Sequence, residues 1–223
     1  MTAPIAAVSA ALVYAGGLVM LFLIRSRRHK AATGSSGFNG FTKTSGVGPR
    51  LAGICFAAAL VLGLSAPLLA ALQLVPYEPA RELTAEWALW VFGLLLTCAG
   101  FTAAVVSQNT MGTSWRIGVD QTEETALVTS GVFAQVRNPI FTAMIAAQAG
   151  TALMAPTWLA AIGLLLLVVA CELQVRLVEE PYLARLHGAR YRAYAAHAGR
   201  FLPGLGRLSN STDRASFAHE RLS

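Results

Sequence analysis

The sequence is poor in charge for its length. Only 13% of its 223 residues are Asp, Glu, Lys or Arg, against about 25% in an average soluble domain. Apolar residues make up 55% of the chain, and the mean hydropathy is +0.56. This balance argues against an ordinary soluble enzyme and indicates a protein that crosses a membrane several times.

Cysteine and histidine are scarce and widely scattered. Each of the three cysteines lies inside an apolar run, where a thiol behaves as a small hydrophobic group. The four histidines have neither the spacing nor the companion cysteines of a zinc site. The sequence therefore predicts no disulfide framework and no bound metal.

The signatures of several common site types are also missing. The two Gly-x-Gly pairs, at 46–48 and 204–206, do not follow a strand or open a phosphate-binding helix, so a nucleotide-binding loop is unsupported. No serine stands in a strand-to-helix elbow. Only Gln148 is clearly polar deep inside a long apolar run, which is little for a transporter.

Long uncharged stretches are what the sequence does have, at residues 3–24, 51–75, 87–106 and 140–171. Each of the first three suits one crossing, which takes roughly 20 apolar residues. The fourth, at 32 residues, would form a helix of about 48 Å and is too long for one span. Pro156 interrupts it and favours the start of a new helix. We therefore expect two short helices folded as a hairpin over residues 140–178, and an all-α integral membrane protein with five transmembrane helices.

The basic residues support this count. With five spans, residues 25–50, 107–139 and 172–223 share one side and carry sixteen of the seventeen Lys and Arg residues, which leaves only Arg81 opposite. The positive-inside rule then predicts an inner, cytoplasmic-membrane protein with its N-terminus outside and its C-terminus in the cytoplasm. Because orientation explains the positive charge, nucleic-acid binding is not needed to account for it.

The expected organisation has three parts. Residues 1–106 hold three transmembrane helices and a cytoplasmic loop at 25–50, residues 107–203 hold the polar segments and the hairpin, and residues 204–223 form a flexible tail. Apolar and aromatic residues recur every three or four positions over 181–203, which predicts a cytoplasmic interfacial helix.

Charged residues continue directly from the last span. Glu172, Arg176, Glu179 and Glu180 fall on one helical stripe, and such a stripe normally faces the bundle or a wet cavity rather than lipid. The alternative is an ordinary helix end in the headgroup region, with a Glu172–Arg176 pair. The hairpin would bring this stripe beside the segment that ends at 137–139, in one polar pocket next to apolar helices.

A series of spaced residues runs through the C-terminal half, over about residues 107–203. Its members are Gly131, Arg137, Asn138, Pro139, Phe141, Glu179, Glu180, Leu183, Gly188, Tyr191, Tyr194, Arg200, Phe201, Leu202 and Pro203. The series resembles the isoprenylcysteine carboxyl methyltransferase and phospholipid methyltransferase family. The resemblance implies a multi-span membrane enzyme that transfers the methyl group of S-adenosylmethionine to a lipophilic or small acceptor. It also implies a cofactor held at the cytoplasmic face.

Residue roles follow from the resemblance position by position. Arg137 and Asn138 would hold the polar ends of the cofactor, and Pro139 would start the fourth span. Glu179 and Glu180 would meet its amino group or ribose hydroxyls. The aromatic side chains that would line its pocket are Tyr191 and Tyr194.

Two residues are candidates for catalysis. Arg200 would stand near the acceptor or the cofactor carboxylate, and Glu180 is the candidate base for an acceptor that needs one. The family usually has histidine and tyrosine where this chain has Asn138 and Phe141, so a histidine base is absent at that position.

Several roles and alternatives remain open. Ser114, Trp115 and Arg116 are candidates for contact with the acceptor, although a tryptophan near a membrane face is commonly an anchor. The acceptor is a thiol, amine, hydroxyl or carboxyl compound, and a membrane lipid is the expected partner. Two other functions compete: an NADPH-dependent sterol-type reductase, which shares a similar C-terminal pattern, and a non-catalytic membrane binding or transport protein.

Overall fold

The computed structural model describes residues 3–36, 46–76, 83–112, 115 and 126–208. Helices dominate these residues, and the described part of the chain holds no strand, only an isolated bridge between Val136 and Gly199. The helices are α1 (Ala3–Leu18), η1 (Val19–Ile24), α2 (Arg25–Thr33), α3 (Val47–Ala71), α4 (Leu83–Met111), η3 (Gly131–Ala134), α5 (Pro139–Met154), α6 (Trp158–Gln174), η4 (Val175–Glu179) and α7 (Glu180–His197). The predicted all-α class is confirmed for this part of the chain.

Four helical segments are long and apolar enough to cross a membrane: Pro4–Thr33, Val47–Ala71, Glu86–Met111 and Trp158–His197. Helix α5 is a shorter apolar helix of 16 residues. The expected break in the last apolar stretch is present, because α5 ends at Met154 and α6 begins at Trp158 with Thr157 as its N-cap. Whether α5 makes a fifth crossing stays a prediction.

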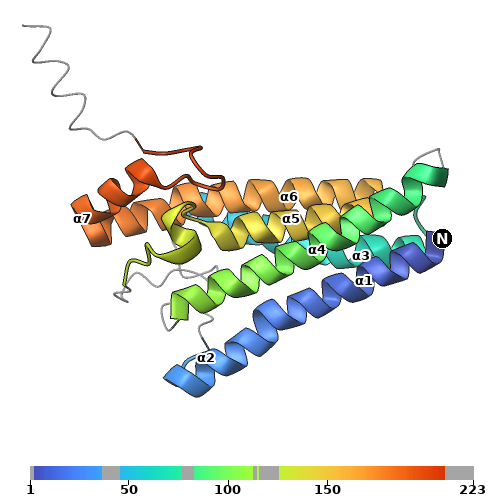
Figure 1. Cartoon of the computed structure of the whole chain (residues 1–223), viewed down its shortest axis with the longest axis horizontal. Helices are drawn as coiled ribbons and strands as arrows, with labels where there is room; N and C mark the ends of the chain where they lie inside the picture. Colours follow the sequence, from blue (N-terminus) through green and yellow to red (C-terminus); the bar gives the residue numbers. More distant parts are fainter. Residues whose placement is uncertain (1–2, 37–45, 77–82, 113–114, 116–125, 209–223) are drawn as a thin grey trace, which may run out of the picture.

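The long helices lie side by side along the long axis of the molecule (Figure 1). Helix α4 packs chiefly on α5, and α3 packs on both α1 and α6. Glycines allow the closest of these approaches. A Cβ added to Gly150 of α5 would lie 2.5 Å from the Gly93 carbonyl oxygen of α4 and 2.5 Å from the Thr97 hydroxyl oxygen.

Replacing Gly150 with valine is therefore expected to separate α4 from α5. We expect the Tm in detergent to fall, with a loss of about 2–3 kcal/mol in the free energy of unfolding, because overpacking forces the backbones apart. Gly16→Ala is the matched control, since a Cβ at Gly16 meets nothing within 4 Å. Equal Tm values for the two variants would contradict the observed α4–α5 packing.

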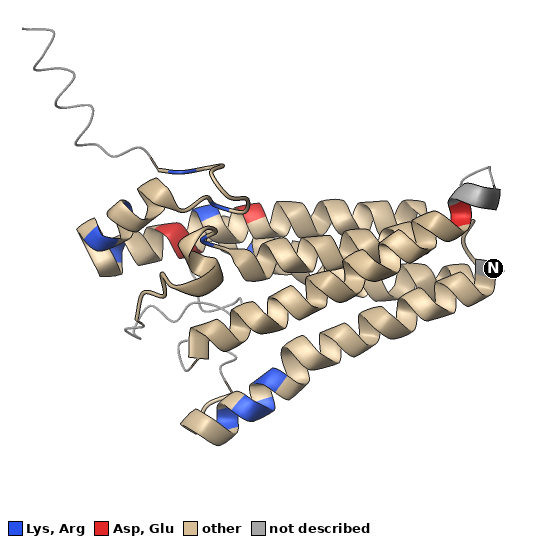
Figure 2. Cartoon of the chain, viewed as in Figure 1, with Lys and Arg blue, Asp and Glu red and all other residues tan. Residues whose placement is uncertain are grey.

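Charge separates along the long axis as the sequence predicted. In Figure 2 the Lys and Arg residues gather at the end opposite the N-terminus, where α2, the start of α5 and α7 lie, together with some acidic residues. Glu86 belongs to the first turn of α4. We call the basic end the polar end. That it faces the cytoplasm stays a prediction.

The last long helix changes character along its length. The segment Trp158–His197 has 40 residues, about 60 Å of helix and twice the thickness of the hydrocarbon core. The charged part from Glu179 onward therefore lies beyond the apolar span. Gly188 has φ +53° and ψ −124°, so the chain turns within α7 and folds back (Figure 1). The helix predicted over 181–203 is thus bent at Gly188 and ends at His197, and its place at the membrane surface stays a prediction.

Candidate functional site

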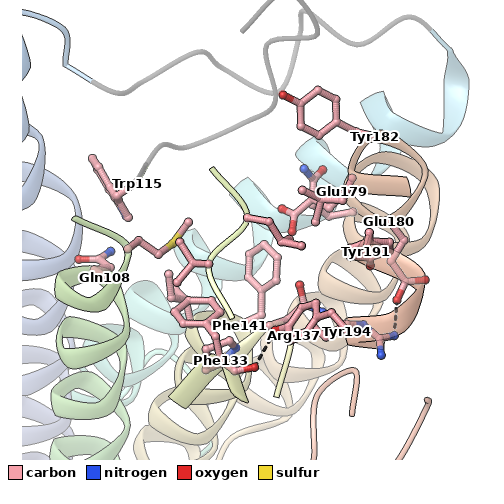
Figure 3. Close-up of a pocket in the computed structure, with 18 of the residues that line it drawn as sticks. Gln108, Trp115, Phe133, Arg137, Phe141, Glu179, Glu180, Tyr182, Tyr191 and Tyr194 are labelled. Atoms are coloured by element: carbon pink, nitrogen blue, oxygen red, sulfur yellow. Dashed lines mark hydrogen bonds and ion pairs between the residues drawn. The ribbon is translucent and has the colours of Figure 1, made fainter. Parts of the chain in front are cut away.

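A cavity of about 200 Å³ lies at the polar end of the bundle. This is more than ten times the roughly 10–15 Å³ that one water molecule requires. Its walls come from η1, α3, α4, the segment before α5, and α5 to α7. Figure 3 shows Arg137, Glu180, Tyr191 and Tyr194 grouped on one side of it.

An ion-pair cluster forms the wall beside α7. The Glu180 carboxylate accepts a hydrogen bond from Arg137 Nη2 at 2.7 Å through one oxygen, which also accepts from Arg200 Nε at 2.8 Å. Arg200 Nη2 donates to the second oxygen at 3.0 Å. The Arg137 side chain is 3% exposed and the other two are each 14% exposed. Such buried and hydrogen-bonded pairs hold their geometry well, and removing one partner is costly.

Arg137 also ties the C-terminal segment to the bundle. Its Nη1 donates to the carbonyl oxygens of Ala195 and Ala198, and its Nη2 donates to that of Gly206 at 3.0 Å. The remaining donor, the Nε–H, is buried and has no partner within the described part of the chain. An unpaired buried donor on the wall of a cavity is available to a ligand.

Backbone pairing fixes the loop that carries Arg137. The Arg137 amide donates to the Gly199 carbonyl oxygen at 2.8 Å, and Gly199 in turn donates to Gln135 at 2.9 Å. Both the backbone amide and the side-chain amide of Asn138 donate to the Arg200 carbonyl oxygen, at 3.1 and 3.0 Å. The segments before α5 and after α7 therefore form one unit.

A tight turn closes this unit. Gly199 is required there, because a Cβ at this position would overlap the carbonyl oxygen of Leu202. The Arg200 amide donates to the Leu205 carbonyl oxygen at 2.7 Å, and Gly206 has φ +71°, which disfavours any residue with a Cβ. We call residues 199–206 the C-terminal turn.

Two tyrosines of α7 complete the polar wall. The Tyr194 hydroxyl donates to the Phe133 carbonyl oxygen at 2.6 Å, and the rings of Tyr191 and Tyr194 meet edge to face at 6.3 Å. Burial raises the pKa of each hydroxyl to about 12, so both stay protonated near neutral pH. Tyr191 is 1% exposed.

A second part of the cavity lining is apolar, and we call it the apolar end. It is lined by Phe22 of η1, Phe56 of α3, Met111 of α4, and Phe141 and Met144 of α5. The Phe56 and Phe141 rings meet edge to face at 6.3 Å. One cavity thus joins an ionic end to an apolar end inside the bundle.

A comparison with family models finds one match, to the phospholipid methyltransferase family over residues 88–190. This segment is similar to the phospholipid methyltransferases. The match confirms the family resemblance over this segment, which runs from α4 into α7 and includes Arg137, Asn138 and Glu180. Arg200 lies outside it. No curated protein matches the chain.

The fold brings the predicted cofactor residues together. Arg137, Asn138, Glu179, Glu180 and both tyrosines line the cavity, and Pro139 lines it at the first turn of α5. Arg200 contributes through Glu180 and through its carbonyl oxygen, which holds Asn138. The spatial grouping agrees with the prediction, while the roles themselves remain predictions.

The charged stripe that begins at Glu172 is divided by a π-helical turn. The turn η4 inserts an extra residue per turn between Glu172 and Glu180 and so rotates the later residues around the axis. Glu172 and Arg176 form an exposed pair with each other, outside the cavity, whereas Glu179 and Glu180 line it. The Glu172–Arg176 half of the stripe is therefore an exposed ion pair, whereas the Glu179–Glu180 half faces the cavity.

The environment of Glu180 sets its chemistry. Burial by itself would raise the pKa of the carboxyl, but hydrogen bonds and charges from Arg200 and Arg137 outweigh it and hold the pKa below its ordinary value. The carboxylate is ionised near neutral pH, and both of its oxygens accept hydrogen bonds from guanidinium groups. A general base near neutrality needs a higher pKa and a free oxygen.

Trp115 lines the far side of the cavity and is 2% exposed. The Arg25 guanidinium lies 5.1 Å from the centre of its ring, and the His29 ring meets it edge to face at 5.5 Å. Arg25 also donates to the Gly112 carbonyl oxygen at 2.7 Å, which joins η1 and α2 to the end of α4. Ser114 and Arg116 lie outside the described residues.

Two amides on the cavity wall were missed by sequence reasoning about the site. Gln108, 4% exposed, donates to the Leu21 carbonyl oxygen at 3.2 Å, and Gln174 of α6 is 5% exposed. The available signal was a neutral polar residue at the polar end of an apolar run. Gln174 stands between two charged residues, Glu172 and Arg176, which are the stronger signal in the sequence.

Proposed function

We propose that this protein is an integral membrane methyltransferase that transfers the methyl group of S-adenosylmethionine to a lipophilic acceptor. The observation that carries the proposal is the single cavity with an ionic end and an apolar end. A charged, aromatic-bearing cofactor suits the first and a hydrocarbon chain suits the second. The family match over residues 88–190 supports methyl transfer.

The residues at the ionic end fit such a cofactor. S-adenosylmethionine carries an ammonium, a carboxylate, ribose hydroxyls and an adenine ring. The unpaired Arg137 Nε–H suits an anionic or carbonyl oxygen, the Glu179 carboxylate suits the ammonium or the hydroxyls, and the Tyr191 ring suits the adenine. When bound, this cofactor supplies a methyl group activated by a sulfonium.

Glu180 and Asn138 hold other groups of the site in position. We propose that Glu180 orders Arg137 and Arg200 and does not remove a proton, because both its oxygens are engaged. Asn138 holds the C-terminal turn through the Arg200 carbonyl oxygen. A rigid polar wall beside a dry apolar one aligns two partners and excludes water, which is most of what a methyl transfer requires.

The positive end of the bundle also suggests how the protein lies in its membrane. We propose that the polar end faces the cytoplasm, since Lys and Arg of the described residues gather there (Figure 2). The acceptor would then enter the apolar end from the inner leaflet.

Cofactor binding tests the proposal. We expect purified protein in detergent to bind S-adenosylmethionine and its demethylated product S-adenosylhomocysteine in calorimetric titrations, and to bind NADPH at least about tenfold more weakly. Incubation with methyl-labelled S-adenosylmethionine and a lipid extract should transfer label into the lipid fraction. Tight binding of NADPH without binding of S-adenosylmethionine would contradict it.

A further inference from the structure

Gln174 is a largely buried residue whose side-chain amide faces the cavity. It is 5% exposed and lines the cavity, and within the part of the chain that the structure describes its side chain has no hydrogen-bond partner. The fully buried side-chain atoms without a partner do not include the Gln174 amide, so its oxygen and nitrogen are open to whatever fills the cavity. A ligand in the cavity can therefore complete its hydrogen bonds.

The same bundle shows that it can satisfy a buried glutamine. Gln148 of α5 is 2% exposed; its side chain accepts from the Tyr14 hydroxyl at 2.8 Å and donates to the Ala59 carbonyl oxygen at 3.2 Å. Both glutamines lie in apolar helices at nearly the same burial. Gln148 lies away from the cavity lining and is paired, whereas Gln174 lies on the lining and is unpaired.

The position of Gln174 indicates which part of a bound molecule it meets. Gln174 is the last residue of α6 and lies six residues before Glu180, on the α6 side of the π-helical turn η4. One turn before it is Cys171, which belongs to the same core cluster as Phe56 and Met144. The amide therefore lies at the junction of the ionic and apolar ends, where an acceptor's polar head would approach the cofactor.

The charges of the cavity indicate what kind of head this is. The charged residues of the described lining, Arg137, Glu179 and Glu180, lie at the ionic end, and Glu180 is paired with Arg137. Glu179 follows Gln174 by one π-helical turn and, in the function proposed above, is engaged by the cofactor. With Glu179 engaged in this way, a charged head beside Gln174 would leave water without a free counter-charge next to it. A neutral head that can both donate and accept a hydrogen bond can pair with the carbonyl oxygen and the NH₂ group of the Gln174 amide.

Resting on the proposed function, we propose that Gln174 binds the uncharged, hydrogen-bonding head group of a lipophilic acceptor and so selects neutral heads over charged ones. It is a positioning and specificity residue, distinct from the groups that hold the cofactor. A hydroxyl on a long alkyl chain is the simplest molecule with this chemistry.

Native mass spectrometry of the detergent-solubilised protein tests this with four C16 probes: hexadecan-1-ol, hexadecane, hexadecylamine and hexadecanoate. Loss of one or two hydrogen bonds corresponds to roughly a tenfold change in affinity. We expect the wild-type protein to bind hexadecan-1-ol about tenfold more tightly than each of the others. Gln174→Leu should bind the alcohol and the alkane alike, and the matched control Gln148→Leu should keep the preference.

Stability separates this role from a structural one. Without ligand, Gln174→Leu should have a Tm equal to or above that of the wild type, because it breaks no hydrogen bond within the described part of the protein, whereas Gln148→Leu should lower the Tm by breaking two hydrogen bonds. Gln174→Met, of similar volume, gives the same test if the leucine variant fails to fold.

Each outcome has a distinct meaning. Equal binding of all four probes by the wild type, a preference for a charged probe, or an alcohol preference that survives in Gln174→Leu would overturn the inference. A tenfold loss of S-adenosylmethionine affinity in Gln174→Leu would also overturn it, since the amide would then serve the cofactor. Failure of the wild type to bind S-adenosylmethionine contradicts the proposed function, whereas the probe preference tests Gln174 alone.

Discussion

Replacing Arg137 with methionine is expected to abolish cofactor binding and to destabilise the C-terminal segment. The variant removes the Nη2 bond to Glu180 and the bonds to the carbonyl oxygens of Ala195, Ala198 and Gly206. Breaking a buried ion pair costs about 3–5 kcal/mol. We expect a loss near 3 kcal/mol in the free energy of unfolding, because Glu180 keeps Arg200.

Affinity for S-adenosylmethionine should fall at least about 100-fold in Arg137→Met, equal to about 2.7 kcal/mol. Arg176→Met is the matched control: Arg176 pairs with Glu172 at the surface, its side chain is 55% exposed, and it lies outside the cavity. This control should change stability by less than about 0.5 kcal/mol. Calorimetric titration and thermal unfolding measure both quantities, and a stable Arg137→Met protein with wild-type affinity would refute the role of this cluster.

Gly199→Ala is expected to have the second-largest effect. A Cβ at this position would overlap the backbone carbonyl oxygen of Leu202, and backbone atoms cannot move aside as a flexible side chain can. The C-terminal turn would have to reopen, which would displace Arg200 and the Gly206 carbonyl that Arg137 contacts. We expect a loss of about 3 kcal/mol in stability and a parallel loss of cofactor affinity.

Limited proteolysis and thermal unfolding check the Gly199→Ala prediction. Cleavage near residues 199–206 should become faster than in the wild type. Gly16→Ala is the control, because Gly16 lies in α1 with nothing within 4 Å of a new Cβ, and alanine should stabilise that helix by up to about 1 kcal/mol. A Gly199→Ala protein with an unchanged cleavage pattern would show that the turn tolerates a side chain.

Much of the architecture could be predicted because its causes are visible along the sequence. Long apolar runs predicted the long helices, and Pro156 predicted the break between α5 and α6. The uneven placement of Lys and Arg predicted a single polar end, as Figure 2 shows. These features depend on local composition, which a single sequence records.

The details of the site depend on contacts that composition does not record. Nothing in the sequence marks the π turn at Val175–Glu179, which separates Glu172 from Glu180 around the helix. The pairing of Val136 with Gly199 joins segments far apart in the chain, so it could not be inferred from spacing. Gly188 was visible as a family position, but its positive φ and the bend it allows were not.

The contacts among the site residues could not be predicted from the residues taken one at a time. Glu180 was a candidate base when considered alone, whereas its two guanidinium partners lower its pKa and occupy its oxygens. Arg200 was expected near the acceptor or the cofactor carboxylate; in the structure its guanidinium binds Glu180 and its carbonyl oxygen binds Asn138. These contacts depend on the packing of the C-terminal turn against the loop before α5, which joins residues far apart in the chain.

The most direct test of the central claim is an experimental structure of the protein with S-adenosylhomocysteine bound. The account predicts density for this molecule at the ionic end of the cavity, within hydrogen-bond distance of the Arg137 Nε–H and beside Tyr191, with the apolar end left open for an acceptor. Density elsewhere on the protein, with the Arg137–Glu180–Arg200 cluster untouched by ligand, would contradict it.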